Sequence, residues 1–124
     1  MNEIGLLSTL EQADLIRRGD LSSRELTEHL IDRIERLDGD INAVVTRDFE
    51  VALEASDVAD ALQQRGDLSG ALHGVPITVK DALETQNLKS TGGAIELKDN
   101  IPNRDAAVVA SVRSEGAIVM GKTN

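Results

Sequence analysis

The spacing of apolar positions along the chain predicts four helices and three short strands. Two helices near the N-terminus open with the same pattern, a serine followed three residues later by a glutamate, which is typical of a capping box. Each helix is followed by a glycine, the residue that most often ends a helix. The serine, glutamate and glycine are Ser8, Glu11 and Gly19 in the first helix and Ser22, Glu25 and Gly39 in the second.

The next part of the pattern combines two strands with one helix. Residues 43–46 and 75–79 are short β-branched runs that predict strands. Between them, apolar residues recur at helical spacing up to Gly66, and this order predicts a βαβ unit with a parallel strand pair and a right-handed crossover. The positions expected on the buried face of this helix are Val51, Ala55, Val58, Ala59 and Leu62.

A fourth helix and a third strand are predicted near the C-terminus. Asp105 is the expected cap of the helix, which ends at Gly116, and residues 117–120 form the strand. The apolar positions of this helix are Val108, Val109 and Val112.

Together these elements predict an α/β fold with helices packed on a mostly parallel sheet. A parallel sheet needs cover on both faces, and only Gly121–Asn124 follow the last strand, so we expect an incomplete sheet. The chain is therefore expected to form a single partial domain, with a helical start over residues 1–40 and βα units over residues 41–124.

The composition narrows the classes of function. The net charge is −9 and Phe49 is the single aromatic residue, so neither nucleic acid nor an anionic membrane is an expected partner. The absence of cysteine excludes disulfides, thiolate zinc sites and cysteine nucleophiles, and the two histidines, His29 and His73, are too few for a metal cluster. We expect a soluble cytoplasmic protein that needs no metal or cofactor.

The predicted strand over residues 75–79 leads directly into Lys80 and Asp81. Alternation along a strand places Pro76, Thr78 and Lys80 on one face and Asp81 on the other. A lysine here could simply reach solvent at the strand end. It could also lie at the carboxyl edge of a parallel sheet, where α/β proteins gather their ligands.

Residues 116–123 match the P-loop pattern G-x-x-x-x-G-K-S/T. A working P-loop needs a loop between a strand and a following helix, whereas the four variable residues here are apolar and predict a strand. Nucleotide binding is therefore not expected, and Lys122 is interpreted as an exposed cation at the end of that strand.

Several motifs follow one another in a defined order over nearly the whole chain. They are Leu21–Leu26, Leu72–Asp81, Ser90–Gly93, Asp105–Val109 and Gly116–Asn124. Together they resemble the amidase signature family, and the terminal Gly-Lys-Thr-Asn is part of that resemblance. This explains the apparent P-loop without a nucleotide.

The resemblance implies hydrolysis of the carbon–nitrogen bond of small carboxylic amides by a Ser–cis-Ser–Lys triad. Lys80 would be the catalytic base, with Asp81, Thr91 and Gly92 as supporting residues. A lysine base must be neutral, so its pKa must fall well below the usual value through burial and hydrogen bonding.

Both serines of such a triad belong to a Gly/Ser-rich segment that comes after the Gly-Lys-Thr-Asn motif. Ser90, Ser111 and Ser114 lie in no such context, so the 124 residues alone are expected to be inactive. One alternative is an amidase-like subunit that supplies ammonia for transamidation of misacylated tRNA, although Thr91-Gly92-Gly93 favours general amidases. Another is a non-catalytic fragment or interaction module that forms a homo-oligomer through its open sheet.

Overall fold

The computed structural model describes residues 3–124, and this part of the chain contains four α-helices, three strands and two short 3₁₀ helices. Their order is η1 Ile4–Leu6, α1 Thr9–Arg18, α2 Ser23–Leu37, β1 Val44–Arg47, α3 Phe49–Gln64, β2 Pro76–Lys80, η2 Ile95–Leu97, α4 Ala107–Ser114 and β3 Ile118–Thr123. The predicted helices and strands are therefore confirmed in number and order.

Both predicted capping boxes are present. The Ser22 hydroxyl accepts a hydrogen bond from the Glu25 N–H at 2.9 Å, and the Glu25 carboxylate accepts one from the Ser22 N–H at 2.9 Å. Ser8 and Glu11 make the same pair of bonds at the start of α1. Gly19 ends α1 in the left-handed conformation, with φ of 76°.

The sheet is mixed, with strand order β1-β3-β2. Strands β2 and β3 are parallel and are joined through α4, whereas β1 runs antiparallel to β3. The predicted parallel pairing of residues 43–46 with residues 75–79 is wrong, because β3 lies between these two strands. Nearly every residue of β3 is buried, which suits a central strand, whereas half of the short β1 is exposed and suits an edge.

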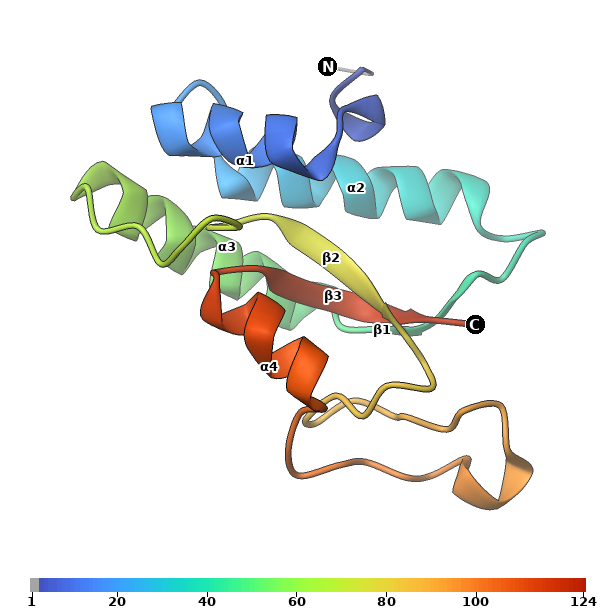
Figure 1. Cartoon of the computed structure of the whole chain (residues 1–124). Coiled ribbons are helices and arrows are strands. Elements are labelled where there is room, and N and C mark those ends of the chain that lie inside the picture. Colours follow the sequence, from blue (N-terminus) through green and yellow to red (C-terminus); the bar gives the residue numbers. More distant parts are fainter. Residues whose placement is uncertain (1–2) are drawn as a thin grey trace.

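Helices cover both faces of the sheet (Figure 1). On one face, Ile118 and Met120 of β3 pack against α3 and α2. On the other face, Val79 and Val119 pack against Val109 of α4. A third cluster joins α1 and α2 to the start of β2, and its buried members are Ala13, Ile16, Leu21, Leu26 and Val75.

The buried face of α3 agrees in part with the predicted one, because Ala59 is buried and Ala55 packs against the core as expected, whereas two predicted valines do not. Val51 and Val58 are exposed, and the buried residues are Ala52, Ser56 and Ala59. These three small side chains let α3 approach the sheet and α2 closely, whereas the larger valines point to solvent. Similarly, Val109 of α4 is buried but its neighbour Val108 is exposed.

A long loop over residues 81–106 joins β2 to α4 and extends away from the helices (Figure 1). Asp105 does not cap α4 as predicted, since the capping position is Ala106 and no side chain caps the helix. Instead, the Asp105 carboxylate accepts a hydrogen bond from the Gln86 N–H at 2.8 Å and pairs with Arg113 at 3.1 Å. It therefore fastens the loop to the helix.

None of the helices within residues 3–124 is long and apolar enough to cross a membrane.

Candidate active site

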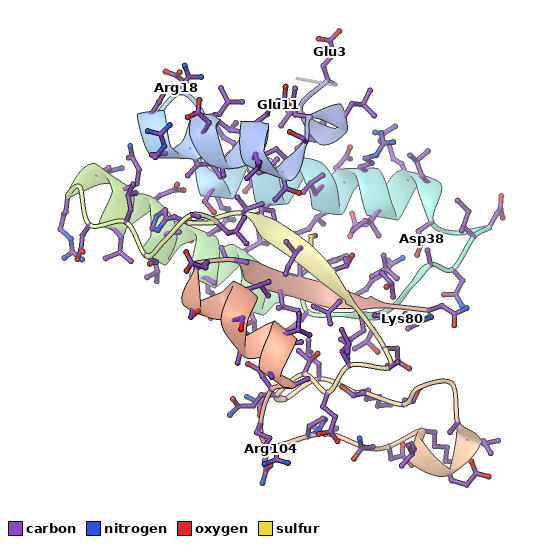
Figure 2. The ribbon with its side chains drawn as sticks, in the orientation of Figure 1. Glu3, Glu11, Arg18, Asp38, Lys80 and Arg104 are labelled. Carbon is purple, nitrogen blue, oxygen red and sulfur yellow. The ribbon has the colours of Figure 1, made fainter. Side chains whose placement is uncertain are left out.

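Lys80 is the last residue of β2, and its side chain is exposed where the strand enters the long loop (Figure 2). Its backbone is held on the sheet opposite Thr123 of β3. Its carbonyl accepts a hydrogen bond from the Leu83 N–H at 3.0 Å, which turns the chain immediately after the strand. The lysine is thus fixed at its backbone and accessible at its amine.

The predicted alternation holds over the end of β2. Thr78 and Lys80 are exposed, whereas Val79 and Asp81 are buried on the other side. Pro76 lines the same groove beside α2 as Thr78, in agreement with the predicted shared face, although Pro76 is buried and Thr78 is exposed.

Asp81 brings the loop back to the sheet. Its buried carboxylate accepts hydrogen bonds from the Thr91 hydroxyl and, at 3.1 Å, from the Thr91 N–H. Its N–H donates to the Thr123 carbonyl at 2.7 Å, and its carbonyl accepts from the Gly92 N–H at 3.3 Å. The structure therefore brings Asp81, Thr91 and Gly92 together, and Asp81 is the residue that directly follows Lys80.

The charge of Asp81 is also stabilised. Burial raises the pKa of its carboxyl, but the hydrogen bonds from Thr91 and the charge of Lys122 outweigh burial and lower that pKa below its ordinary value. Asp81 is consequently a carboxylate at neutral pH and acts as an acceptor for the loop.

Lys122 is the residue that the sequence interpretation placed wrongly. It was expected to be an exposed cation, but β3 continues through it and its side chain is 0 % exposed. Its Nζ donates to the Leu83 carbonyl and to the Ser90 hydroxyl, each at 2.8 Å. Burial lowers the pKa of the Lys122 amine, and the negative charge of Asp81 opposes this shift.

Ser90 is fully engaged in the same loop. Its hydroxyl donates to the Leu88 carbonyl at 3.1 Å and accepts from the Thr85 N–H at 3.1 Å as well as from Lys122. Such a hydroxyl is held by its neighbours and is not poised as a nucleophile.

The strand conformation of residues 118–123 also agrees with the expectation that the apparent P-loop is not one.

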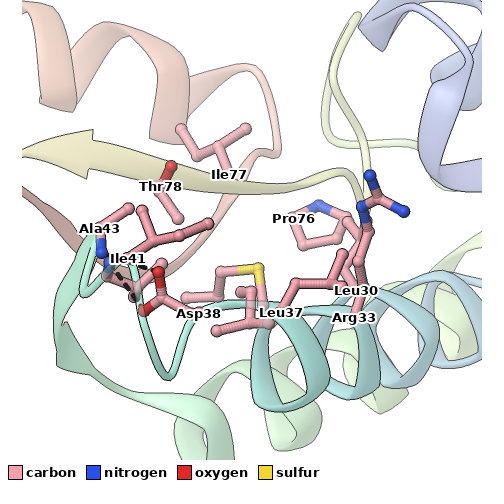
Figure 3. Close-up of a pocket in the computed structure, with 12 residues that line it drawn as sticks. Leu30, Arg33, Leu37, Asp38, Ile41, Ala43, Pro76, Ile77 and Thr78 are labelled. Atoms are coloured by element: carbon pink, nitrogen blue, oxygen red, sulfur yellow. Dashed lines mark hydrogen bonds between the residues drawn. The ribbon is translucent and has the colours of Figure 1, made fainter.

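A groove of about 360 Å³ lies between α2 and β2 (Figure 3). Apolar side chains form most of its wall, and Lys80 is not among the lining residues, which are Leu30, Arg33, Ile34, Leu37, Asp38, Ile41, Ala43, Val44, Pro76, Ile77, Thr78 and Met120. The groove is thus separate from the lysine. Among residues 3–124, no group of three or more His, Cys, Asp or Glu side chains is arranged to hold a metal ion.

His73 has a structural role, because both of its ring nitrogens are engaged by the backbone. It is buried, its Nδ1 accepts a hydrogen bond from the Ser69 N–H at 2.9 Å, and its Nε2 lies 2.8 Å from the Ala59 carbonyl. Since Nδ1 accepts, Nε2 carries the proton and donates it.

Comparison with known proteins gives a consistent result. The family model described as Amidase matches residues 25–124. Over 122 residues, the chain is 41% identical to a subunit of the glutamyl-tRNA(Gln) amidotransferase of Moorella thermoacetica, and the match covers 98% of this chain and 25% of that protein.

Solved structures agree with the sequence comparison. The native peptide amidase from Stenotrophomonas maltophilia superposes with a TM-score of 0.86 and 31% identity, over 94% of this chain and 24% of that one. A bacterial aryl acylamidase of the amidase signature enzymes family superposes with a TM-score of 0.86 and 30% identity, over 95% of this chain and 25% of that one. The chain thus spans about a quarter of the length of the proteins it matches.

Proposed function

Because the chain belongs to the amidase family, we propose that it forms the lysine-bearing part of an enzyme that hydrolyses carboxylic amides. The observation that carries this proposal is the exposed amine of Lys80 at the carboxyl end of β2, on a backbone that is fixed by Leu83 and by β3. Ligands of α/β proteins gather at this end of parallel strands.

In this proposal Lys80 is the base of a Ser–cis-Ser–Lys triad. Its neutral amine accepts a proton from a bridging serine, which in turn activates the serine that attacks the amide carbonyl. Both serines come from a segment outside these 124 residues. When that segment covers Lys80, burial disfavours the ammonium form and lowers the pKa of the amine, as a base at neutral pH requires.

The supporting residues act on the position of this base. Asp81, Thr91 and Gly92 close the loop against the sheet and leave the amine of Lys80 free on the opposite side of the strand. The substrate is a small carboxylic amide. No metal or cofactor is needed, because the chemistry is proton transfer and acyl transfer between side chains and substrate.

A second candidate function is release of ammonia for an amidotransferase. The Moorella protein that is 41% identical to this chain is named as one subunit of such an enzyme. In that case the amide is glutamine, and activity depends on further subunits.

The experiment uses the complete product of the gene that encodes these residues. Ammonia release is measured from glutamine and from simple aliphatic and aromatic amides, for the wild type, Lys80→Ala and the control Lys89→Ala, since Lys89 is an exposed lysine of the neighbouring loop. We expect Lys80→Ala to lower kcat/KM by about 10³-fold, the scale of general base catalysis, and Lys89→Ala to change it less than about twofold. A wild type that hydrolyses none of these amides, or a Lys80→Ala enzyme with ordinary activity, would overturn the proposal.

A further inference from the structure

We propose that Lys122 is a positioning residue. Its buried ammonium hydrogen-bonds to both legs of the loop that follows β2, to Leu83 in the first leg and to Ser90 in the second, and thereby holds Lys80 in place. The inference deepens the proposed function, on which the chemical role of Lys80 rests. The network that supports it consists of hydrogen bonds within the chain and does not depend on that role.

The first leg of the loop leaves β2, and two hydrogen bonds of Leu83 link Lys80 to Lys122 there. The Leu83 N–H donates to the Lys80 carbonyl at 3.0 Å, and the Leu83 carbonyl in turn accepts from Lys122 Nζ at 2.8 Å. A single residue therefore separates the ammonium from the backbone of the proposed base. Loss of this bond would release the turn that follows Lys80.

The second leg returns to the sheet at Ser90, which Lys122 also binds at 2.8 Å. The same hydroxyl accepts from the Thr85 N–H and donates to the Leu88 carbonyl, so it closes the loop upon itself. Lys122 thus joins residues 39 and 32 positions away from it in sequence. It does so from β3, the strand that is paired with β2.

The charge of Lys122 is compensated inside the protein. Asp81 is also buried, and its charge interacts with that of Lys122. The carboxylate is held in turn by Thr91. The two opposite charges therefore lie on the buried side of the strand pair, while Lys80 faces the exposed side.

An apolar residue at position 122 would fill the same space without the cost of burying a positive charge, but it would leave the buried Asp81 carboxylate without that compensating charge, which is destabilising. What the apolar residue could not do is hydrogen-bond to both legs of the loop. The specific contribution of Lys122 is therefore geometric, and a suitable test separates the position of the loop from the overall stability.

The first measurement is amide hydrogen exchange of the complete gene product, followed by NMR. The variants are Lys122→Met, which keeps side-chain length but removes the charge and the donors, and the control Lys89→Met on the same loop. We expect the Leu83 and Thr85 amides to exchange at least about tenfold faster in Lys122→Met, with a smaller change for the buried amides of α2. Equal acceleration of all amides, or none at the loop, would refute the positioning role.

Ser90→Ala keeps the test decisive if Lys122→Met does not fold. This variant removes one acceptor of Lys122 and leaves the Asp81 charge in place. It should accelerate exchange at the Leu83 amide, by a smaller factor, and an unchanged Leu83 amide would overturn the inference. The Thr85 amide is left out of this comparison, because the Ser90 hydroxyl is its own acceptor.

The second measurement is kinetic and uses the complete gene product. Lys122→Met should lower kcat per folded enzyme at least about tenfold with KM changed less than about twofold, as expected when the position of a catalytic group is lost rather than substrate binding. An unchanged kcat per folded enzyme would mean that Lys122 only stabilises the fold. If Lys80→Ala were fully active, the proposed function would fail, whereas the exchange results would still decide whether Lys122 holds the loop.

Discussion

Replacement of Gly74 by alanine should destabilise the protein more than the same replacement at Gly66. Both glycines have left-handed backbone conformations, with φ of 74° and 70°. They differ in surroundings, because a methyl group at Gly74 would lie 2.9 Å from the Cβ of Ser23 and 3.0 Å from its Oγ, whereas nothing lies within 4 Å of one at Gly66. The pair therefore separates backbone strain from steric overlap.

Ser23 has little freedom to move away from the added methyl group. It is fully buried, and its hydroxyl donates to the Gly74 carbonyl at 2.5 Å. Its N–H donates to the Asp60 carboxylate at 2.7 Å, which fixes the first turn of α2. The contact thus joins the start of α2 to the residue that precedes the buried Val75 and β2.

The expected magnitudes follow from these two components. A left-handed conformation costs a non-glycine residue about 1–2 kcal/mol, and this cost applies at both positions. Overpacking of a well-filled site adds about 1–3 kcal/mol at Gly74. Gly74→Ala should therefore lower the free energy of unfolding by about 2–5 kcal/mol, and Gly66→Ala by about 1–2 kcal/mol.

The assay is urea unfolding at constant m-value, which converts a change in midpoint into a change in stability. A double-mutant cycle with Ser23→Gly tests the contact directly, because removal of the serine side chain should recover the packing part of the loss but not the backbone part. Equal losses at Gly74 and Gly66, or a cycle without coupling between positions 23 and 74, would refute the steric argument.

Two further predictions concern Asp38 and Ser90. The hydrogen bond from the Ala43 N–H is the largest cause of a lowered pKa of the Asp38 carboxyl, and the Val44 N–H adds to it. The stabilisation by Asp38 is therefore present above the unfolded-state pKa of about 3.9 and is lost as pH falls through the folded-state pKa. Asp38→Asn should lower the urea midpoint at pH 7 and converge with the wild type in acid, and a constant difference across pH would contradict this. The second prediction is that a fluorophosphonate probe forms no adduct with Ser90 in the 124-residue chain, because the Ser90 hydroxyl already donates to the Leu88 carbonyl. Stoichiometric labelling of Ser90, observed by mass spectrometry, would contradict this prediction.

Features set by contacts within one turn of helix could be predicted from the sequence. The boxes at Ser8 and Ser22 are complete within four residues, so the sequence pattern and the structure agree. The exposure of Val51 and Val58 could not be predicted from the spacing of apolar residues. Which face of α3 is buried depends on how closely this helix approaches α2 and the sheet. The predicted strand pairing was wrong for a similar reason, since the neighbour of β1 is a strand that begins more than seventy residues later, at Ile118.

Lys122 shows how one residue of strand register decides a side chain's environment. In a regular strand Lys122 would share a face with Ile118 and Met120, which pack against α3 and α2. The pairing is not regular, because consecutive residues of β2, Ile77 and Thr78, lie opposite Val119 and Gly121 of β3.

Met120 is thus an extra residue on β3, and an extra residue in one strand reverses the alternation beyond it. Lys122 consequently lies opposite Val79 and beside the face covered by the loop, where Ser90 and the Leu83 carbonyl receive its ammonium. The apolar run that predicted this strand contains no sign of the irregularity. For the same reason, a variant that restored regular pairing at Met120 would move the lysine to the opposite face and leave the loop after Lys80 without its tie.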